Sequence, residues 1–238
     1  QLRTFNNAVG WFRPFEPRRE NYLFDDFTGA VTATAFVGDT VWNTTVAGAG
    51  AAISVPAIAT TSEIGILQLS TGTTATGSAL IRKNATSIAF GSGVIVCEFK
   101  INIVTLSTGA QTFIIRAGIT SGGTLDPVNG VYFEYNTALG TTWRGRTSAA
   151  STRTDLNTGV VPAVGTTFNT LRFEVNAAAS SVTYFVDDVN VGSITTNIPT
   201  GTAQACGDNF VIRKSVGTTA RTAQIDFWYR SCVFTNLR

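Results

Sequence analysis

The feature that most limits the fold of this chain is a regular alternation of side chains that suit a core and side chains that suit water. It is clearest in residues 94–103. There Ile95, Cys97, Phe99, Ile101 and Ile103 alternate with Val94, Val96, Glu98, Lys100 and Asn102. A period of two places successive side chains on opposite faces of a β-strand, so that one face packs and the other meets solvent. Similar runs occur at 64–69, 111–119, 131–135, 171–175, 182–186, 209–213 and 224–234.

Turn-forming residues separate these runs, at 71–72, 107–109, 121–123, 129–130 and 157–159. Nowhere does a 3.6-residue period last for ten residues, so the helical crossovers of a parallel α/β fold are missing. We therefore predict an all-β fold, an antiparallel two-sheet jelly-roll sandwich of about a dozen strands.

The length of 238 residues suits one large β-domain, and the apolar fraction of 44% fills a sizeable core. Charged residues make up only 13%, and the net charge is +2. Nucleic-acid binders are usually strongly basic, and a membrane span needs roughly 18–20 consecutive apolar residues, which this chain lacks. We expect no nucleic-acid partner and no membrane span.

The first 21 residues differ from the rest, and we divide the chain into an extended N-terminal arm, 1–21, and a β-sandwich domain, 22–238. Pro14 and Pro17 lie close enough to break both a helix and an inner strand. Two interpretations remain: the arm wraps its own domain, or it docks on a neighbouring subunit. Its contact residues would be of types that interfaces favour: Trp11, Phe12, Arg13, Phe15, Arg18 and Arg19.

The chain has three cysteines, Cys97, Cys206 and Cys232. Their spacing fits neither a zinc motif nor a disulfide scaffold. Cys97 shares a strand face with Ile95 and Phe99, so we interpret it as a small core residue. For Cys206 and Cys232 we favour unlinked buried thiols, with a disulfide between them as the alternative.

Three passages resemble concanavalin-like and laminin-G-like domains. Residues 167–196 are similar to the strand–turn–strand hairpin of these domains, with Asp188 in place of the usual Gly. Because Asp tolerates a positive φ better than most residues, a primed turn still fits. Residues 22–27 resemble the opening strand of these domains, and 224–229 resemble the closing strand that returns beside it. The likeness covers about 22–235 and implies a concanavalin-like or laminin-G-like sandwich.

Domains of this kind that are poor in charge and rich in Thr, Ala and Gly resemble parts of bacteriophage virions. This resemblance implies a structural protein of the virion: a capsid decoration, a tail fibre or a receptor-binding tip. Its partners would be other virion proteins, contacted through the arm, together with a glycan of the host surface, and we expect a homo-oligomer. The alternative is a carbohydrate-binding module of an extracellular protein, and a third hypothesis is a glycan-cleaving enzyme.

Several kinds of catalytic site are excluded because the chain has no His: a Ser-His-Asp triad, a Cys-His pair and His-bound zinc. Glycosidases use two carboxylates roughly 5–10 Å apart. The glycosidases among the domains that this chain resembles carry Glu-x-Asp-x-Glu or Glu-x-Asp-x-x-Glu on one strand, and neither run is present here. Glu98, Glu134 and Glu174 occur one to a strand, which is typical of cross-strand ion pairs. If their strands were neighbours, they would line one sheet face, near Arg116, Arg144, Arg146 and Arg172. We expect a protein that is not an enzyme.

We expect no cofactor, with a Ca²⁺ ion as the alternative. Relatives by resemblance often hold Ca²⁺ with oxygen ligands, and the acidic pairs Asp25-Asp26 and Asp187-Asp188 are the candidates. An Asp in a turn usually bonds its own backbone instead.

A sugar site would use exposed aromatic side chains with polar neighbours. The best candidates are Tyr132, Tyr135, Trp143, Arg144 and Arg146. Trp143 and Arg144 point to opposite faces of their strand, and the alternative for any aromatic residue here is the core. We interpret Trp228 and Tyr229, in the last strand, as core residues.

Overall fold

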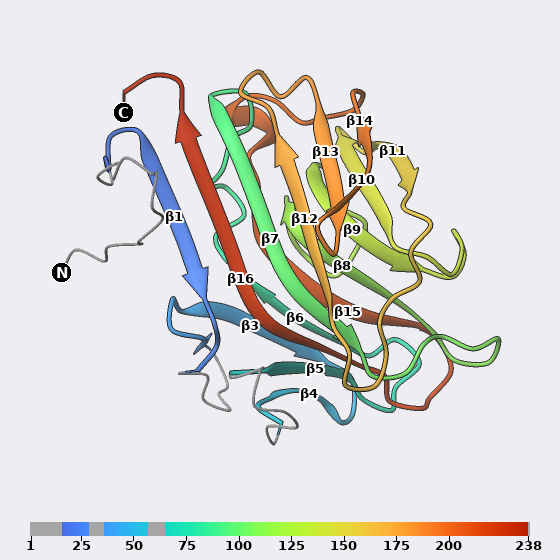
Figure 1. Ribbon diagram of the computed structural model, residues 1–238. Helices are drawn as coiled ribbons and strands as arrows, with labels where there is room; N and C mark the ends of the chain where they lie inside the picture. Colours follow the sequence, from blue (N-terminus) through green and yellow to red (C-terminus); the bar gives the residue numbers. More distant parts are fainter. Residues whose placement is uncertain (1–15, 29–35, 57–64, 238) are drawn as a thin grey trace, which may run out of the picture.

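Two antiparallel β-sheets packed face to face make up the computed structural model, which describes residues 16–28, 36–56 and 65–237 (Figure 1). The predicted all-β sandwich of the jelly-roll type is confirmed. Trp11, Phe12, Arg13 and Phe15 of the predicted arm lie outside the described residues. Arg18 and Arg19 precede the first strand, which begins at Glu20.

Each sheet has eight strands among the described residues. Sheet A contains, in spatial order, β14 (Val189–Ile194), β13 (Val182–Val186), β12 (Asn169–Val175), β7 (Gly93–Ile103), β16 (Thr222–Phe234), β5 (Leu67–Thr71) and β4 (Ala51–Ser54), with β1 (Glu20–Asp25) also paired to β16. Sheet B contains β11 (Thr152–Asn157), β10 (Arg144–Ala149), β9 (Gly130–Asn136), β8 (Thr112–Thr120), β15 (Gly207–Val216), β6 (Ser78–Arg82), β3 (Trp42–Ala47) and β2 (Phe36–Val37).

Helix is almost absent from the part of the chain that the structure describes. It consists of one 3₁₀ turn, Thr202–Gln204. No helix in these residues has the length and apolar character needed to cross a membrane.

The first and last strands lie side by side, as the resemblance implied. β1 pairs with β16 in antiparallel register, from Glu20 opposite Val233 to Asp25 opposite Trp228. Figure 1 shows β16 running between β1 and β7 along the front sheet. The closing strand therefore ties the start of the domain to its centre.

The alternation of residues places one face of each central strand in the core. Along β7, Cys97 and Phe99 are fully buried between the sheets, whereas Glu98 faces outward. The ring of Phe99 stacks on Trp228 with centroids 4.7 Å apart and meets Phe133 of sheet B edge-on at 6.1 Å. Aromatic contacts of this kind join the two sheets and add to the stabilisation from burial.

The turn between β13 and β14 is the primed turn that the sequence predicts. Asp187 and Asp188 both have positive φ, 50° and 63°, which matches the right-handed twist of the flanking strands. The Asp187 carboxylate accepts hydrogen bonds from Thr170 N and Asn169 Nδ2, both at 2.8 Å. It therefore holds this turn against the start of β12.

All three cysteines are buried and none forms a disulfide. The prediction of unlinked thiols is confirmed, and Cys97 lies in the core as expected. Burial raises the pKa of Cys97 well above its ordinary value and that of Cys206 to about 12. Because the thiolate is the reactive form, these two thiols are chemically quiet at neutral pH.

Candidate functional site

The outer face of sheet B carries a buried carboxylate at its centre. Glu134 projects outward from β9, yet it has no exposed surface. Its Oε2 accepts hydrogen bonds from Arg116 Nε on β8 at 2.8 Å and from Arg146 Nη1 on β10 at 3.0 Å. Its Oε1 accepts one from Asn136 Nδ2 at 3.0 Å. Three neighbouring strands thus converge on one acidic side chain.

Two more carboxylates flank the arginines. Arg116 pairs with Asp126, and Arg146 Nε lies 2.5 Å from Asp155 Oδ1 on β11. The strands β8 to β11 follow one another as hairpins, so their outward residues fall into register and each guanidinium lies between two acids. We call Arg116, Asp126, Glu134, Arg146 and Asp155 the Glu134 network.

The contacts of Glu134 suit a structural role better than proton transfer to or from a substrate. A general acid or base must reach a proton of the substrate. Both arginines donate to the same oxygen of Glu134, and an amide fills the other. The described contacts of Glu134 therefore leave it no oxygen facing a ligand.

Loop 121–129, which joins β8 to β9, folds over this face. Ser148 Oγ donates to the carbonyl oxygens of Pro127 and Val128, at 3.0 and 2.9 Å. Arg153 Nη2 also donates to Pro127 O, at 3.1 Å, and Arg116 holds Asp126. The network therefore fixes the loop that covers it.

Buried polar atoms without a hydrogen-bond partner gather on the same face. Tyr132 is the clearest case, because its side chain is fully buried and its hydroxyl meets no partner in the described structure. Burial also raises the pKa of Tyr132 to about 12, so the phenol keeps its proton. Such atoms normally bind water or a ligand. The others on this face are Arg116 Nη1, Arg144 Nε, Arg146 Nε, Arg153 Nε and Asn209 Oδ1, of which Arg146 Nε has an ion pair with Asp155 but no hydrogen bond.

An open groove lies at the other end of the same face, over β3 and β6. We call it the Arg82 groove; its volume is about 580 Å³. Its lining is Asn43, Thr44, Thr45, Arg82, Lys83, Asn84 and Ala85. Arg82 is exposed and forms no ion pair with a described residue. A Cβ placed on Gly122 of loop 121–129 would lie 3.5 Å from Arg82 Nη1, so the loop borders the groove.

Lys83 is less available than Arg82. Its Nζ donates to Thr40 Oγ1 and Val41 O, both at 2.9 Å, and lies 4.8 Å from the centre of the Trp42 ring. Burial lowers the pKa of Lys83 to about 8, against the opposing effect of Asp25. In the groove, Lys83 is therefore held by the protein while Arg82 faces solvent.

The predicted sugar cluster divides between the two faces of sheet B. Tyr132, Arg144 and Arg146 lie on the outer face, although the side chain of Tyr132 is fully buried there. Tyr135 and Trp143 are buried in the core, with rings 6.2 Å apart. These two aromatic residues offer no surface on which a sugar can stack, so the five residues do not form one site.

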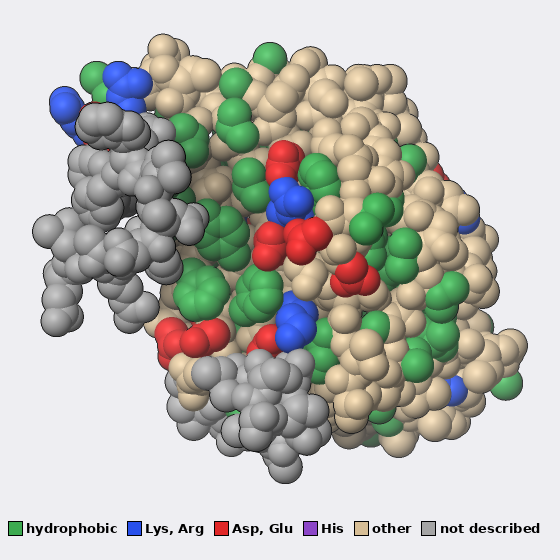
Figure 2. All heavy atoms as spheres, viewed as in Figure 1, with side chains coloured by type: hydrophobic (Ala, Val, Ile, Leu, Met, Phe, Trp, Pro, Cys, Tyr) green, Lys and Arg blue, Asp and Glu red, His purple; other side chains and the backbone are tan. Residues whose placement is uncertain are grey.

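The three glutamates considered in the sequence, Glu98, Glu134 and Glu174, do not lie on one face. Glu98 on β7 and Glu174 on β12 lie on the outer face of sheet A, where Arg172 pairs with both. Glu134 lies on the opposite side of the molecule, on sheet B. The hypothesis that the three glutamates line one face is wrong, because β9 does not pair with β7 or β12. Figure 2 shows acidic and basic side chains gathered at the middle of the sheet A face.

The sheet A face also presents aromatic side chains that the sequence analysis did not select. Tyr22 and Phe24 on β1 are 47% and 56% exposed, and the Phe24 ring lies 6.4 Å from that of Phe227. Tyr229 is only half-buried on this face, so its interpretation as core was wrong, whereas Trp228 is fully buried as predicted. The alternation along β1 could have indicated this exposure. Leu23 and Asp25 point inward, so Tyr22 and Phe24 between them point outward.

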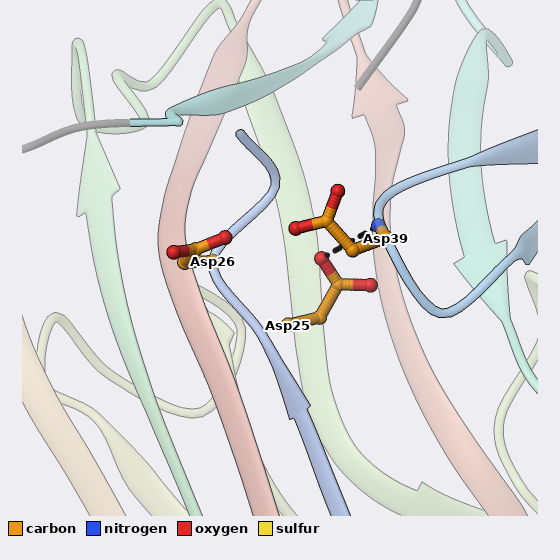
Figure 3. Close-up of side chains that lie close together, drawn as sticks. All are labelled: Asp25, Asp26 and Asp39. Atoms are coloured by element: carbon orange, nitrogen blue, oxygen red, sulfur yellow. Dashed lines mark hydrogen bonds between the residues drawn. The ribbon is translucent and has the colours of Figure 1, made fainter. Parts of the chain in front are cut away.

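The acidic pair Asp25-Asp26 lies near Asp39, and one carboxylate oxygen from each of the three is within 4.8 Å of the other two. Figure 3 shows these three side chains. Asp25 is fully buried and its carboxylate accepts five hydrogen bonds. The donors are Phe27 N, Asp39 N, Thr40 N, Thr40 Oγ1 and Trp42 Nε1. Ca²⁺ takes six to eight oxygen ligands. Because both Asp25 oxygens already accept hydrogen bonds, this group serves to clamp the turn before β3.

The other acidic pair is equally engaged in local structure. Asp187 bonds the start of β12, and Asp188 is 85% exposed with its Oδ1 3.8 Å from Arg172 Nη2.

The basic residues of the predicted arm that the structure describes, Arg18 and Arg19, both pair with Glu16.

The fold has known structural relatives. A protein of unknown function, SO2946 from Shewanella oneidensis MR-1, superposes with a TM-score of 0.59 at 17% identity, over 95% of this chain and 92% of its own. An endo-1,3-beta-glucanase from Streptomyces sioyaensis gives 0.59 at 11% identity, over 94% and 100%. The carbohydrate recognition domain of Emp47p gives 0.55 at 13%, over 91% and 98%.

At these identities the structural likeness establishes the fold alone, a concanavalin A-like sandwich. No curated protein sequence matches this chain. The sequence profile of the family described as SO2946-like, C-terminal domain, does match it, over residues 62–226. Since that match covers more than half of the residues, the chain belongs to the SO2946-like C-terminal domain family.

Proposed function

We propose that this domain binds a carbohydrate without cleaving it, and that the sugar lies in the Arg82 groove. The observation that carries the proposal is the lining of the groove, in which only Ala85 lacks a polar side chain. Sugars present hydroxyl groups that both donate and accept hydrogen bonds. Amides, hydroxyls and a guanidinium complement such groups, and they are the groups gathered here.

The charge of the groove favours an acidic sugar. Arg82 forms no ion pair with a described residue, and Asn43 lies directly opposite it in the β3–β6 register. A guanidinium matches the geometry of a carboxylate and binds it through two parallel hydrogen bonds. A polysaccharide that contains uronic acid is therefore the class of ligand that fits best. That the relatives named above include a glucanase and a carbohydrate recognition domain supports a sugar as the ligand.

The absence of cleavage rests on Glu134. It is the acidic side chain at the centre of the sheet B face, and both of its oxygens accept hydrogen bonds from neighbouring side chains. Retaining and inverting glycosidases alike need two carboxylates that reach the glycosidic bond. In the Glu134 network every carboxylate is paired to an arginine instead.

Isothermal titration of the full chain with two polymers tests the proposal. Polygalacturonate is expected to bind and the neutral β-1,3-glucan laminarin to bind more weakly. Arg82→Ala is expected to weaken polygalacturonate binding at least tenfold, since hydrogen bonds to charged groups contribute about 1.5–3 kcal/mol each. Arg18→Ala, an exposed arginine outside the groove, is the matched control and should bind normally. Equal affinity of Arg82→Ala and the parent chain would reject the groove.

A second candidate function is the assembly role that the sequence predicts, in a virion. The observation in its favour is the pair of exposed aromatic residues, Tyr22 and Phe24, on strand β1, which begins at Glu20 within the last two residues of the predicted arm. Exposed apolar surface of this kind suits contact with another protein. Deletion of residues 1–20 should then abolish incorporation into particles, and normal incorporation would count against it. None of the relatives named above is a viral protein, so this role stays a prediction.

A further inference from the structure

A second pocket, separate from the Arg82 groove, opens between the sheets where β1, β16 and β7 meet. Its volume is about 480 Å³, within the roughly 300–1,000 Å³ of small-molecule sites. Ile88, Ile95 and Phe234 form apolar walls, and Asn21, Arg230 and Cys232 supply polar atoms. A pocket with apolar walls and a few convergent polar groups is typical of ligand sites.

Arg230 is the charged group of this pocket, and it is only 8% exposed. Its Nε donates to both oxygens of Asp208 at 3.1 Å, and Trp228 Nε1 donates to Asp208 Oδ1 at 3.1 Å. The ion pair therefore lies on the Nε side of the guanidinium. Asp208 is fully buried and fixed by Trp228, so it holds Arg230 in one orientation.

The other side of the guanidinium faces the pocket. Arg230 Nη1 contacts two lining residues, Asn21 Oδ1 at 3.0 Å and Cys232 Sγ at 3.1 Å. Nη2 has no hydrogen-bond partner among the residues placed in the structure. Asn21 uses its oxygen as the acceptor, so its Nδ2 group presents two further donors beside the same edge. Because Arg230 and Asn21 both line the pocket, each can offer a donor to the same ligand.

We propose that this pocket binds a small carboxylate with an apolar body. The carboxylate accepts hydrogen bonds from Arg230 Nη2 and Asn21 Nδ2, and the apolar body packs against Ile88, Ile95 and Phe234. A buried guanidinium with a free donor edge prefers an anion to a neutral acceptor, because charge-assisted hydrogen bonds are roughly twice as strong as neutral ones. The site shares no lining residue with the Arg82 groove, so the proposal does not depend on a glycan binding there.

Alkylation of Cys232 reports occupancy, since its thiol lines the pocket. The intact chain is treated with iodoacetamide in the presence of hexanoate, benzoate or the neutral amides hexanamide and benzamide, and the modification of each cysteine is followed by mass spectrometry. Saturating hexanoate or benzoate should slow labelling of Cys232 at least tenfold, and the amides less than twofold. Cys206, which is fully buried outside the pocket lining, should stay unlabelled while the chain is folded, so any label on it would report unfolding and not access to the pocket.

Asn21→Asp is the decisive variant. It keeps the oxygen that accepts from Arg230 Nη1, so the fold is retained, but it replaces the free amide donor with a negative charge. The dissociation constant for hexanoate should rise at least tenfold. Ala89→Trp, which fills the pocket without changing a charge, should abolish protection as well. The proposal is overturned if hexanoate and hexanamide protect Cys232 equally, if neither protects it, or if Asn21→Asp binds hexanoate like the parent chain.

Discussion

Replacing Glu134 with Gln tests whether the Glu134 network holds the outer face of sheet B together. The substitution keeps the shape of the side chain but removes its charge. It also puts an amide donor where Arg116 Nε and Arg146 Nη1 now donate, or, if flipped, against Asn136 Nδ2. At least one donor must then face another donor in a site without solvent.

The expected loss of unfolding free energy depends on the ion pairs that Arg116 and Arg146 keep in the variant. Removing one partner of a buried ion pair costs about 3–5 kcal/mol, because a buried charge is left uncompensated. Arg116 keeps Asp126 and Arg146 keeps Asp155, and both of these acids are partly exposed. We therefore expect the low end, about 3 kcal/mol of unfolding free energy. At about 2–4 °C per kcal/mol for a chain of this size, the melting temperature should fall by about 6–12 °C.

Urea unfolding at pH 7, followed by tryptophan fluorescence, measures this free energy. Glu174→Gln is the matched control, because Glu174 pairs with Arg172 on the more exposed sheet A face, where ion pairs contribute about 0–1 kcal/mol. A loss below about 1 kcal/mol for Glu134→Gln, or equal losses for the two variants, would refute the view that the network is a buried support. Loss of a polysaccharide-cleaving activity in Glu134→Gln would instead revive the hypothesis of an enzyme.

Three further predictions concern single side chains. Tyr132→Phe removes a buried hydroxyl without a partner, so the unfolding free energy in urea should be unchanged or up to about 1 kcal/mol higher; a fall above 1 kcal/mol would mean that the hydroxyl is bonded. The Lys83 pKa is lowered from 10.5 to about 8, so between these pH values the unfolded chain binds more protons at this site. The parent should therefore gain stability over Lys83→Met as the pH rises from 8 to 10.5, and a pH-independent difference in guanidinium unfolding would contradict this. Phe99→Ala should lose about 3–5 kcal/mol by thermal unfolding, because it empties the contact between the sheets, and a loss under 1 kcal/mol would be inconsistent with that packing.

The alternation of residues was enough to predict the strands and the sandwich, because burial of one strand face is a local consequence of the sequence. The alternation could not predict to which of the two sheets a strand belongs. Glu98 and Glu134 have the same surroundings in sequence, an acidic residue between apolar neighbours, yet they lie on opposite outer faces. Strand pairing over long separations decides that, and no period of two encodes it.

The alternation of inward and outward side chains within one strand also predicts which aromatic residues are buried. Arg144 and Arg146 share one face of β10, so the preceding Trp143 belongs to the opposite, inward face, and its burial was predictable. Tyr229 was harder. A bulge between Ile225 and Trp228 shifts the register of β16 against β7, so both of these residues point inward although they are three apart. The shift places Tyr229 outside.

The buried charges of this chain mainly hold the backbone in place. Asp25 clamps the turn before β3, the Glu134 network holds loop 121–129, and Asp208 orients Arg230. A charge that is already satisfied in this way gains little from a ligand, since binding would have to break an existing pair. Ligand binding is therefore expected from groups that line a pocket and keep an open donor, such as Arg82 in the groove and Nη2 of Arg230 in the pocket. The groove and the pocket share no lining residue, although Ala85 of the groove and Ser87 of the pocket are only two positions apart, and saturating hexanoate should leave the affinity for polygalacturonate unchanged.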